Sequence, residues 1–316
     1  MISVVFPPPP VYYRTGTSTI RHTYTVNRST LFDTLHMPGH SYHSLLPESL
    51  LSIYYIEGKI PHQQRFPADS FLGDWEEDGF SFLFFRCPAP ELVEDIVRIN
   101  PGLRLLDTYE MTYEQWQGGR IEPIHIGPYL LTPPWIEATP EPDTRSIILD
   151  PGVVFGNGAH PTTRDCLEAI DLVCTGKKVH SMLDLGTGTG ILALAAVKSG
   201  CKKALAVDFN YLAARTARTN VHLNDMEGNI MVIQGRAEDF TAFPSDLLVA
   251  NIHYEVMKDL VRTPGFLRQK WFLLSGLLRS EARKIISFLA SQPVILVKQW
   301  NKDGIWTTIL GITRNE

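Results

Sequence analysis

A glycine-rich turn between an apolar strand and an apolar helix constrains the fold of this chain most strongly. The sequence Asp-Leu-Gly-Thr-Gly-Thr-Gly at 184–190 follows a strand predicted at 181–185 and precedes a helix predicted at 191–199. Three glycines let the backbone turn sharply and approach a ligand without interference from Cβ atoms. A second apolar strand, 204–207, ends in Asp208, whose carboxylate can accept hydrogen bonds from both hydroxyls of a ribose. This order predicts a nucleoside-binding crevice in an α/β fold.

The spacing of the glycines separates the possible cofactors. A dinucleotide fingerprint that begins at Gly186 or Gly188 requires glycine where Ile191 or Ala193 stands, and no Gly-Lys-Ser or Gly-Lys-Thr of a phosphate-binding loop follows. A Gly-x-Gly-x-Gly turn with an acidic residue ending the next strand is the arrangement of S-adenosylmethionine enzymes. A dehydrogenase is therefore the least favoured function, and an ordinary tight turn is the structural alternative. The predicted cofactor residues of this region are Asp184, Gly186, Gly188, Gly190 and Asp208.

Composition points to a soluble globular protein with a polypeptide target. Of 316 residues, 44% are hydrophobic and 20% are charged, which is enough for two domains with cores of their own. The formal net charge of −5 gives no overall attraction to nucleic acid, so we expect no direct nucleic-acid partner. No apolar run has the length of a membrane span and the first residues lack the pattern of a secretory signal, which predicts a cytoplasmic protein.

The cysteines and histidines do not predict a metal site. The four cysteines form no Cys-x-x-Cys pair, which argues against a zinc ribbon or a redox centre. His36, His40 and His43 lie close together, but Pro38 and Gly39 interrupt any helix that would align them.

Four regions follow one another along the chain. Residues 1–46 are predicted to be an irregular extension, and 47–120 a small α+β domain. Residues 121–145 hold six prolines and are predicted to form a stiff connection. In 146–316 strands and helices alternate, which predicts a mainly parallel, seven-stranded, Rossmann-like sheet with helices on both faces.

The elements expected in the two domains are the following. The small domain has strands at 51–56, 80–85 and 103–111 and a helix at 91–100. The large domain has strands at 181–185, 204–207, 230–234, 246–250, 271–275, 294–300 and 306–312, and helices at 162–173, 191–199, 211–224 and 280–290.

Asn251 follows the fourth strand of the large domain and is a candidate for both binding and catalysis. In open α/β sheets the loops after strands one, two and four converge, which brings Asn251 beside the glycine turn and Asp208. Its side chain can bind the methionine end of the cofactor or steer an incoming amine. A helix N-cap for 254–261 is an equally open interpretation.

The glycine-rich segment 149–163 contributes further candidates. A loop of this kind can fold over a ligand. Thr162 or Thr163 can hydrogen-bond the amino-acid part of the cofactor, although Thr163 can equally be an ordinary first-turn residue. Phe155 can lie against the sulfonium through a cation–π contact. For His160 we expect a positioning role rather than that of a general base.

These motifs together resemble the ribosomal protein L11 methyltransferases. The resemblance rests on 149–163, 184–190, 207–208, 249–252 and 274–278, and it runs from about residue 50 onward. It implies transfer of methyl groups from S-adenosylmethionine to lysine side chains and the N-terminal amine of a ribosomal protein. Segment 72–77 and Trp116 resemble the family's ferredoxin-like substrate-recognition domain. Matched by motif, the family's cofactor residues fall on Thr163, Gly186, Asp208 and Asn251.

Two departures from the family pattern concern the substrate. They are the extension up to about residue 46 and the sequence Ile-His-Tyr-Glu at 252–255, where the family has apolar and small residues. An acceptor lysine on another protein therefore stays an alternative.

Methyl transfer requires few catalytic groups from the protein. It is an in-line displacement, so the protein mainly aligns donor and acceptor. Deprotonating a lysine with a pKa near 10.4 costs about 4.6 kcal/mol at pH 7, and burial beside a positive sulfonium lowers that cost. Asn251 and Phe155 are the predicted catalytic residues, with no dedicated histidine base.

Two other functions stay open. One is methylation of an amide or a nucleobase, because 251–254 distantly resembles Asn-Pro-Pro-Tyr, with Ile252 and His253 in place of both prolines. The other is a catalytically silent S-adenosylmethionine-binding module, which only the N-terminal extension favours.

Overall fold

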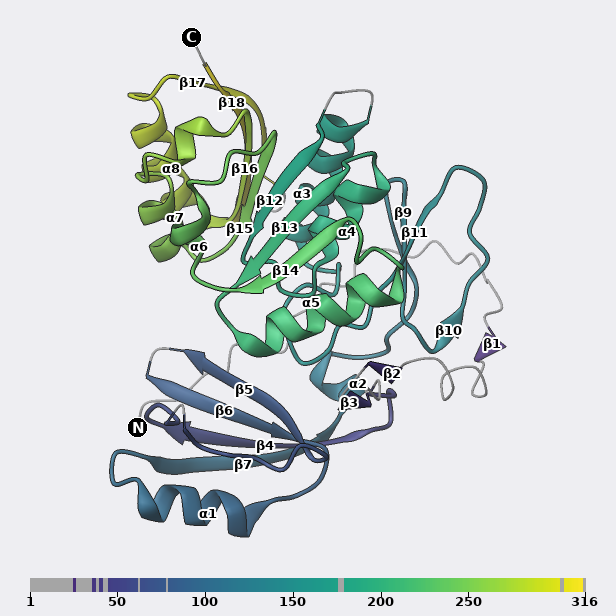
Figure 1. The fold of residues 1–316 in the computed structure, drawn as a ribbon, viewed down its shortest axis with the longest axis vertical. Helices are drawn as coiled ribbons and strands as arrows, with labels where there is room; N and C mark the ends of the chain where they lie inside the picture. The colour runs from purple at the N-terminus through teal and green to yellow at the C-terminus, as the bar shows by residue number, and fades with distance from the viewer. Residues whose placement is uncertain are drawn as a thin grey trace. The chain divides into compact units, whose positions relative to one another are not determined.

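The computed structural model describes residues 25–26, 36–37, 40–41, 45–61, 63–77, 79–175, 179–301 and 304–314 (Figure 1). The chain divides into two compact units. The described residues of Met37–Ile121 form the first, and those of Thr17–His36 and Glu122–Glu316 form the second. Most of the predicted extension 1–46, including the four consecutive prolines at 7–10 and His43, lies outside the described residues.

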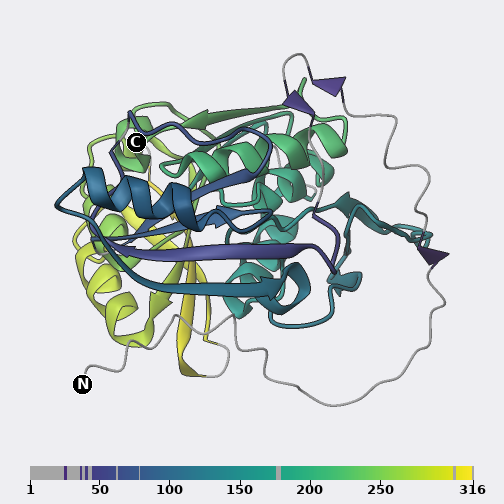
Figure 2. The same cartoon turned by 90° about the horizontal axis from the view of Figure 1, so that it is seen from below.

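The first unit is a four-stranded antiparallel sheet with a helix on one face. Its strands are β4 (Leu50–Glu57), β5 (Phe71–Glu77), β6 (Phe80–Phe85) and β7 (Arg104–Thr112), in the order β5-β6-β4-β7. Helix α1 (Pro90–Ile99) lies along this sheet (Figure 2) and buries Val93 and Ile96 against Tyr54 and Leu83. The one-turn helix α2 (Tyr113–Trp116) follows β7.

This unit confirms an α+β architecture but not its ferredoxin-like detail. A ferredoxin-like fold has the order βαββαβ, with a helix between its first two strands. Here the chain runs from β4 to β5 through turns, and β5 is a strand that the hydrophobic pattern had not predicted.

The proline-rich region 121–145 contains strands that belong to the second unit. Strands β8 (Ile124–Ile126), β9 (Tyr129–Thr132) and β11 (Arg145–Ile148) form a three-stranded sheet in the order β11-β9-β8, and the short β10 (Ile136–Glu137) pairs with β1 (Thr25–Val26). Pro123, Pro128 and Pro133 lie next to these strands rather than inside them, where proline would remove a ladder hydrogen bond.

The short strands β2 (His36–Met37) and β3 (His40–Ser41) also pair with each other.

A seven-stranded sheet forms the centre of the second unit, as predicted. Its strands are β12 (Ser181–Leu185), β13 (Lys203–Asp208), β14 (Ile230–Gln234), β15 (Leu247–Asn251), β16 (Trp271–Leu278), β17 (Val294–Trp300) and β18 (Trp306–Thr313). The order is β14-β13-β12-β15-β16-β18-β17, with β18 antiparallel to both of its neighbours. The strand order reverses between β12 and β15, where α/β sheets bind ligands.

Helices cover both faces of this sheet (Figure 1). One face packs against α3 (Pro161–Cys174), α4 (Ile191–Lys198) and α5 (Tyr211–Leu223). The other packs against α6 (Ala237–Phe240), α7 (Tyr254–Leu260) and α8 (Arg279–Leu289), with the 3₁₀ turn η1 (Phe266–Arg268) before β16. Among the described helices, none has both the length and the apolar character needed to cross a bilayer.

Candidate functional site

The glycine turn lies at the carboxyl end of β12, and its backbone conformation requires glycine. Gly186, Gly188 and Gly190 have φ angles of +75°, +56° and +82°. A Cβ at Gly186 would lie 2.2 Å from Cγ2 of Ile252, and one at Gly188 would lie 2.6 Å from the carbonyl oxygen of Phe155. The chain after β15 and the segment around Phe155 therefore both pack directly on the turn.

Asp208 ends β13 beside this turn and keeps hydrogen-bonding capacity for a ligand. One carboxylate oxygen accepts the Gly188 amide hydrogen at 2.9 Å, and the other accepts that of Asn210 at 2.9 Å. Burial raises the pKa of Asp208, while these two backbone hydrogen bonds act in the opposite direction. A carboxylate has about four acceptor sites, so roughly two stay available for a pair of hydroxyls.

Asp184 lies beneath the turn and is completely buried. Its Oδ2 accepts a hydrogen bond from Thr187 Oγ1 at 2.6 Å. Burial raises the pKa of Asp184 to about 7, and the negative charge of Asp208 contributes to the shift. The contacts of Asp184 therefore fix the shape of the turn from below.

Segment 150–160 is held on the turn by Asn220 of α5, a residue that sequence reasoning missed. Asn220 is completely buried. Its Oδ1 accepts the Asp150 amide hydrogen at 2.8 Å, and its Nδ2 donates to the carbonyl oxygens of Asp150 and Thr189, both at 2.9 Å. Thr189 Oγ1 also donates to the Gly156 carbonyl at 2.8 Å. A polar residue on the buried face of helix 211–223 was the available signal.

Three aromatic rings follow one another next to this segment. The Phe155 ring lies 5.3 Å from that of His160, which lies 5.1 Å from that of Trp306. His160 is the N-cap of α3, where its Nδ1 accepts the Thr162 amide hydrogen at 3.3 Å, and burial lowers its pKa. These contacts agree with a positioning role for His160. Trp306, at the start of β18, was not among the predicted site residues.

Thr163 carries a buried hydroxyl that a ligand can satisfy. Its side chain is 1% exposed, and Oγ1 has no hydrogen-bond partner within the described part of the chain. An unpaired buried polar group costs about 1–3 kcal/mol. Thr162 Oγ1, by contrast, already lies 2.7 Å from His160 Nδ1. Of the two threonines, Thr163 is thus the better candidate for a cofactor contact.

Asn251 ends β15 and is half-buried next to Gly276. Gly276 has φ +82°, and a Cβ there would lie 3.1 Å from Asn251 Oδ1. The N-cap of α7 is His253, so the interpretation of Asn251 as that cap is wrong. The side-chain amide of Asn251 forms no hydrogen bond with a described residue. Its NH₂ donors and its carbonyl acceptor are therefore available to a ligand.

Metal-binding side chains do not gather in the part of the chain that the structure describes. No group of three or more histidine, cysteine, aspartate or glutamate side chains is arranged there to hold a metal ion. The described cysteines are free thiols, and burial raises the pKa of Cys174 to about 12.

Comparison with known proteins gives concordant matches. The family model described as "Ribosomal protein L11 methyltransferase (PrmA)" matches residues 106–314. A ribosomal protein L11 methyltransferase of Listeria monocytogenes serotype 4b is 31% identical over 261 residues, which cover 75% of this chain and 81% of the relative. One from Clostridium perfringens (strain ATCC 13124) is 33% identical over 243 residues, which cover 74% and 76%.

A solved structure shares the fold. The crystal structure of a ribosomal protein L11 methylase from Lactobacillus delbrueckii subsp. bulgaricus superposes with a TM-score of 0.54 at 28% identity. The match covers 62% of this chain and all of that chain.

Proposed function

This chain belongs to the ribosomal protein L11 methyltransferase family, and from that premise we propose that it transfers methyl groups from S-adenosylmethionine to lysine side chains and the N-terminal amine of a ribosomal protein. The observation that carries the proposal is the Asp208 carboxylate, which is bonded to the glycine turn and still has acceptor sites for a ribose. We also propose a cytoplasmic location, because ribosomal proteins would be met there.

The chain's own residues suit each part of the proposed cofactor. Asp208 accepts the two ribose hydroxyls, and the glycine turn allows the backbone to approach the nucleoside. The unpaired Oγ1 of Thr163 and the amide of Asn251 are assigned to the amino-acid end. S-Adenosylmethionine supplies an electrophilic methyl group on a sulfonium that already carries its leaving group.

The remaining task of the protein is to present a neutral amine in line. Deprotonating a lysine at pH 7 costs about 4.6 kcal/mol in water, and a position beside a positive charge lowers this cost. Asn251 Oδ1 accepts an N–H of the acceptor amine and so directs its lone pair toward the methyl group. Phe155, which is 46% exposed, supplies an aromatic face at this position. His160 caps α3 through Nδ1, and we assign it no proton transfer.

The proposal is tested with the purified full chain, labelled S-adenosylmethionine and a mixture of ribosomal proteins. We expect label on lysine or N-terminal amines of one protein. Its absence from all of them contradicts the proposal. Label on glutamine or on nucleic acid would favour the amide or nucleobase alternative. Label on a protein outside the ribosome would show that the acceptor is not a ribosomal protein. Tight cofactor binding without any turnover would favour the silent binding module.

A substitution assigns the role of Asn251. Asn251→Ala is expected to lower kcat by about 100-fold, because the amine loses its orienting acceptor, and to weaken S-adenosylhomocysteine binding by roughly tenfold, because the amino-acid end loses one partner. Asn229→Ala removes a hydrogen bond from Nδ2 to the Lys202 carbonyl at the other edge of the sheet and is the matched control. Equal kcat values for the two variants would remove Asn251 from the catalytic assignment.

A further inference from the structure

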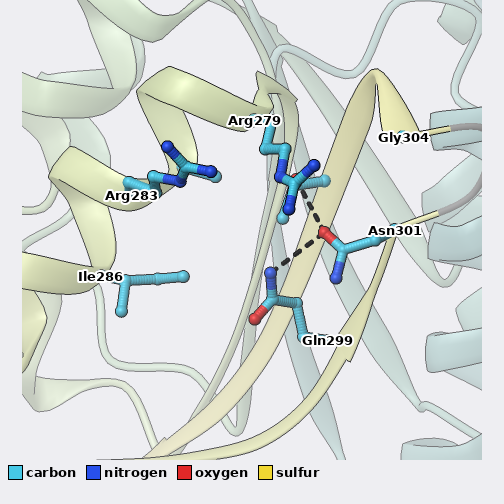
Figure 3. Close-up of a pocket in the computed structure, with 8 residues that line it drawn as sticks. Arg279, Arg283, Ile286, Gln299, Asn301 and Gly304 are labelled. Carbon is cyan, nitrogen blue, oxygen red and sulfur yellow. Dashed lines mark hydrogen bonds between the residues drawn. The ribbon is translucent and has the colours of Figure 1, made fainter.

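A cavity of about 490 Å³ lies between α8 and the end of β17 (Figure 3). The helix contributes two arginines and an apolar floor, and the strands contribute polar groups. In Figure 3 the Arg279 side chain extends from α8 toward Asn301. The lining residues are Arg279, Ala282, Arg283, Ile286, Gln299, Asn301, Gly304 and Thr307. We call this cavity the arginine pocket.

The positive charge of the arginine pocket is not balanced by any carboxylate of the described residues. Arg279 and Arg283 stand one turn apart on α8, and neither forms an ion pair with a described side chain. Glu281, the acidic residue in the first turn of α8, already accepts the Leu278 amide hydrogen at 2.8 Å. Like charges at this spacing repel each other on a helix, so the pair is suited to an external anion.

The polar wall of the pocket contributes an amide donor beside the two arginines. Oδ1 of Asn301 accepts hydrogen bonds from Gln299 Nε2 at 3.1 Å and from Thr307 Oγ1 at 3.0 Å. These bonds occupy the carbonyl of Asn301 and leave its NH₂ group available. Two guanidinium groups and an amide NH₂ together form a donor set suited to an oxyanion.

The arginine pocket lies on the opposite face of β18 from the aromatic contacts of the candidate site. Trp306 and Thr307 are consecutive residues of a strand, so their side chains point to opposite faces. Thr307 lines the pocket, whereas the Trp306 ring contacts His160. The Arg279 amide also donates to the Ile305 carbonyl at 3.0 Å, which ties the pocket to the residue before Trp306.

We propose that the arginine pocket binds a carboxylate of the acceptor protein, an aspartate or glutamate near the amine that is methylated. The proposal rests on the proposed function, because it names a recognition feature of the same acceptor. Trp306 and Thr307 begin β18, so a peptide passes between the two faces over this end of the sheet, across roughly 10 Å, which about three residues of extended chain span. The carboxylate therefore stands about three residues from the target amine.

A carboxylate fits the arginine pocket better than a nucleic-acid phosphate. Guanidinium groups bind carboxylates in a bidentate geometry, and two arginines are enough for one such group. Nucleic-acid binding relies on many phosphate contacts along a basic surface, whereas this chain has a net charge of −5. Ala282 and Ile286 give the pocket an apolar floor on which the methylenes of an acidic side chain can pack.

Two peptides test the proposal directly. Both carry one lysine, followed three residues later by glutamate in one peptide and by glutamine in the other. Binding is measured by calorimetry on the full chain saturated with S-adenosylhomocysteine, so that no turnover occurs. We expect the glutamate peptide to bind about tenfold more tightly, because hydrogen bonds between charged groups are the stronger ones. Equal affinities, or no measurable binding of either peptide, overturn the proposal.

Variants then assign the preference to the pocket. Arg279→Gln with Arg283→Gln is expected to abolish the roughly tenfold preference and to raise the KM for a protein acceptor, with kcat unchanged. The matched control is Arg268→Gln, an exposed arginine in η1, before β16 begins. Persistence of the preference in the double variant would overturn the assignment. So would a loss of RNA binding by that variant without a change in peptide preference.

The same measurements separate this proposal from the proposed function. A glutamate preference without methyl transfer to any amine contradicts the proposed function, but it still supports carboxylate binding in the arginine pocket. Methyl transfer without a glutamate preference contradicts the pocket alone. Both arginines are exposed, and their removal relieves a like-charge pair, so we expect the double variant to melt no lower than the control.

Discussion

The carboxylate of Asp208 accepts the amide hydrogen of Gly188 at 2.9 Å, so the acidic end of β13 and the middle of the glycine turn form one hydrogen-bonded unit. The carboxylate that is assigned to the ribose thus also stabilises the turn that the nucleoside approaches. A change at either residue is expected to affect the other.

Asp208→Ala is expected to weaken binding of S-adenosylhomocysteine by at least about 100-fold, because hydrogen bonds to a charged group contribute about 1.5–3 kcal/mol each. Asp208→Asn keeps one acceptor for the Gly188 amide, so its affinity for S-adenosylhomocysteine should fall less than that of the alanine variant. Isothermal calorimetry measures both values. An affinity within threefold of the wild type in the alanine variant would place the nucleoside elsewhere.

Gly188→Ala is expected to cost more stability than Gly200→Ala, although both glycines have positive φ angles, +56° and +106°. A Cβ at Gly188 would meet the Phe155 carbonyl oxygen at 2.6 Å, whereas nothing lies within 4 Å of one at Gly200. Backbone strain costs both variants about 1–2 kcal/mol. Crowding against the backbone adds roughly 1–3 kcal/mol to the first alone. Denaturant unfolding measures the difference, and equal losses would show that the two segments do not pack as described.

Asn220→Ala is expected to destabilise the second unit by about 2–4 kcal/mol, because it leaves three backbone groups of two segments without their partner. Asn229→Ala, which removes one exposed hydrogen bond, should cost less than about 1 kcal/mol. Urea unfolding followed by circular dichroism gives both values. If the two variants are equally stable, Asn220 does not hold segment 150–160 on the turn.

The raised pKa of Asp184 predicts a pH dependence of stability. Its folded-state pKa of about 7 lies above the unfolded value, so the folded state binds the proton more tightly. The stabilisation from this group is complete below about pH 4 and is lost as the pH rises toward 7. Asp184→Asn cannot ionise, so its unfolding free energy should fall less between pH 5 and pH 8. The control is Asp259→Asn, at an exposed position. If the unfolding free energy of both variants depends on pH as in the wild type, Asp184 does not titrate with a raised pKa.

Most of the large sheet could be predicted from the sequence because its strands are short and apolar and, up to β17, most are separated by helices of regular period. Strands β12, β14 and β17 begin and end at the predicted residues. Strand β5 was missed because Gly73 and Asp74 interrupt its apolar alternation, and the sheet bulges there. The hairpin of β8 and β9 was not predicted because both strands are short and prolines stand directly beside them.

Some residues of the candidate site could be recognised from the sequence and others could not. Glycines and acidic strand ends can be recognised from spacing, because their function depends on local backbone geometry. Asn220 and Trp306 could not, since each acts through residues far away in the sequence: Asn220 through Asp150 and Thr189, and Trp306 through His160. The unpaired hydroxyl of Thr163 likewise becomes visible only when all its neighbours are placed.

The position of β18 between β16 and β17 has a consequence for how the large sheet can assemble. Residues 306–313 bridge two strands that precede them in sequence, so β17 joins the sheet only through β18. A nascent chain shorter than this would leave one edge of β16 and the whole of β17 without backbone hydrogen-bond partners. Deletions within 306–313 should therefore produce insoluble aggregates rather than a weakened but folded protein.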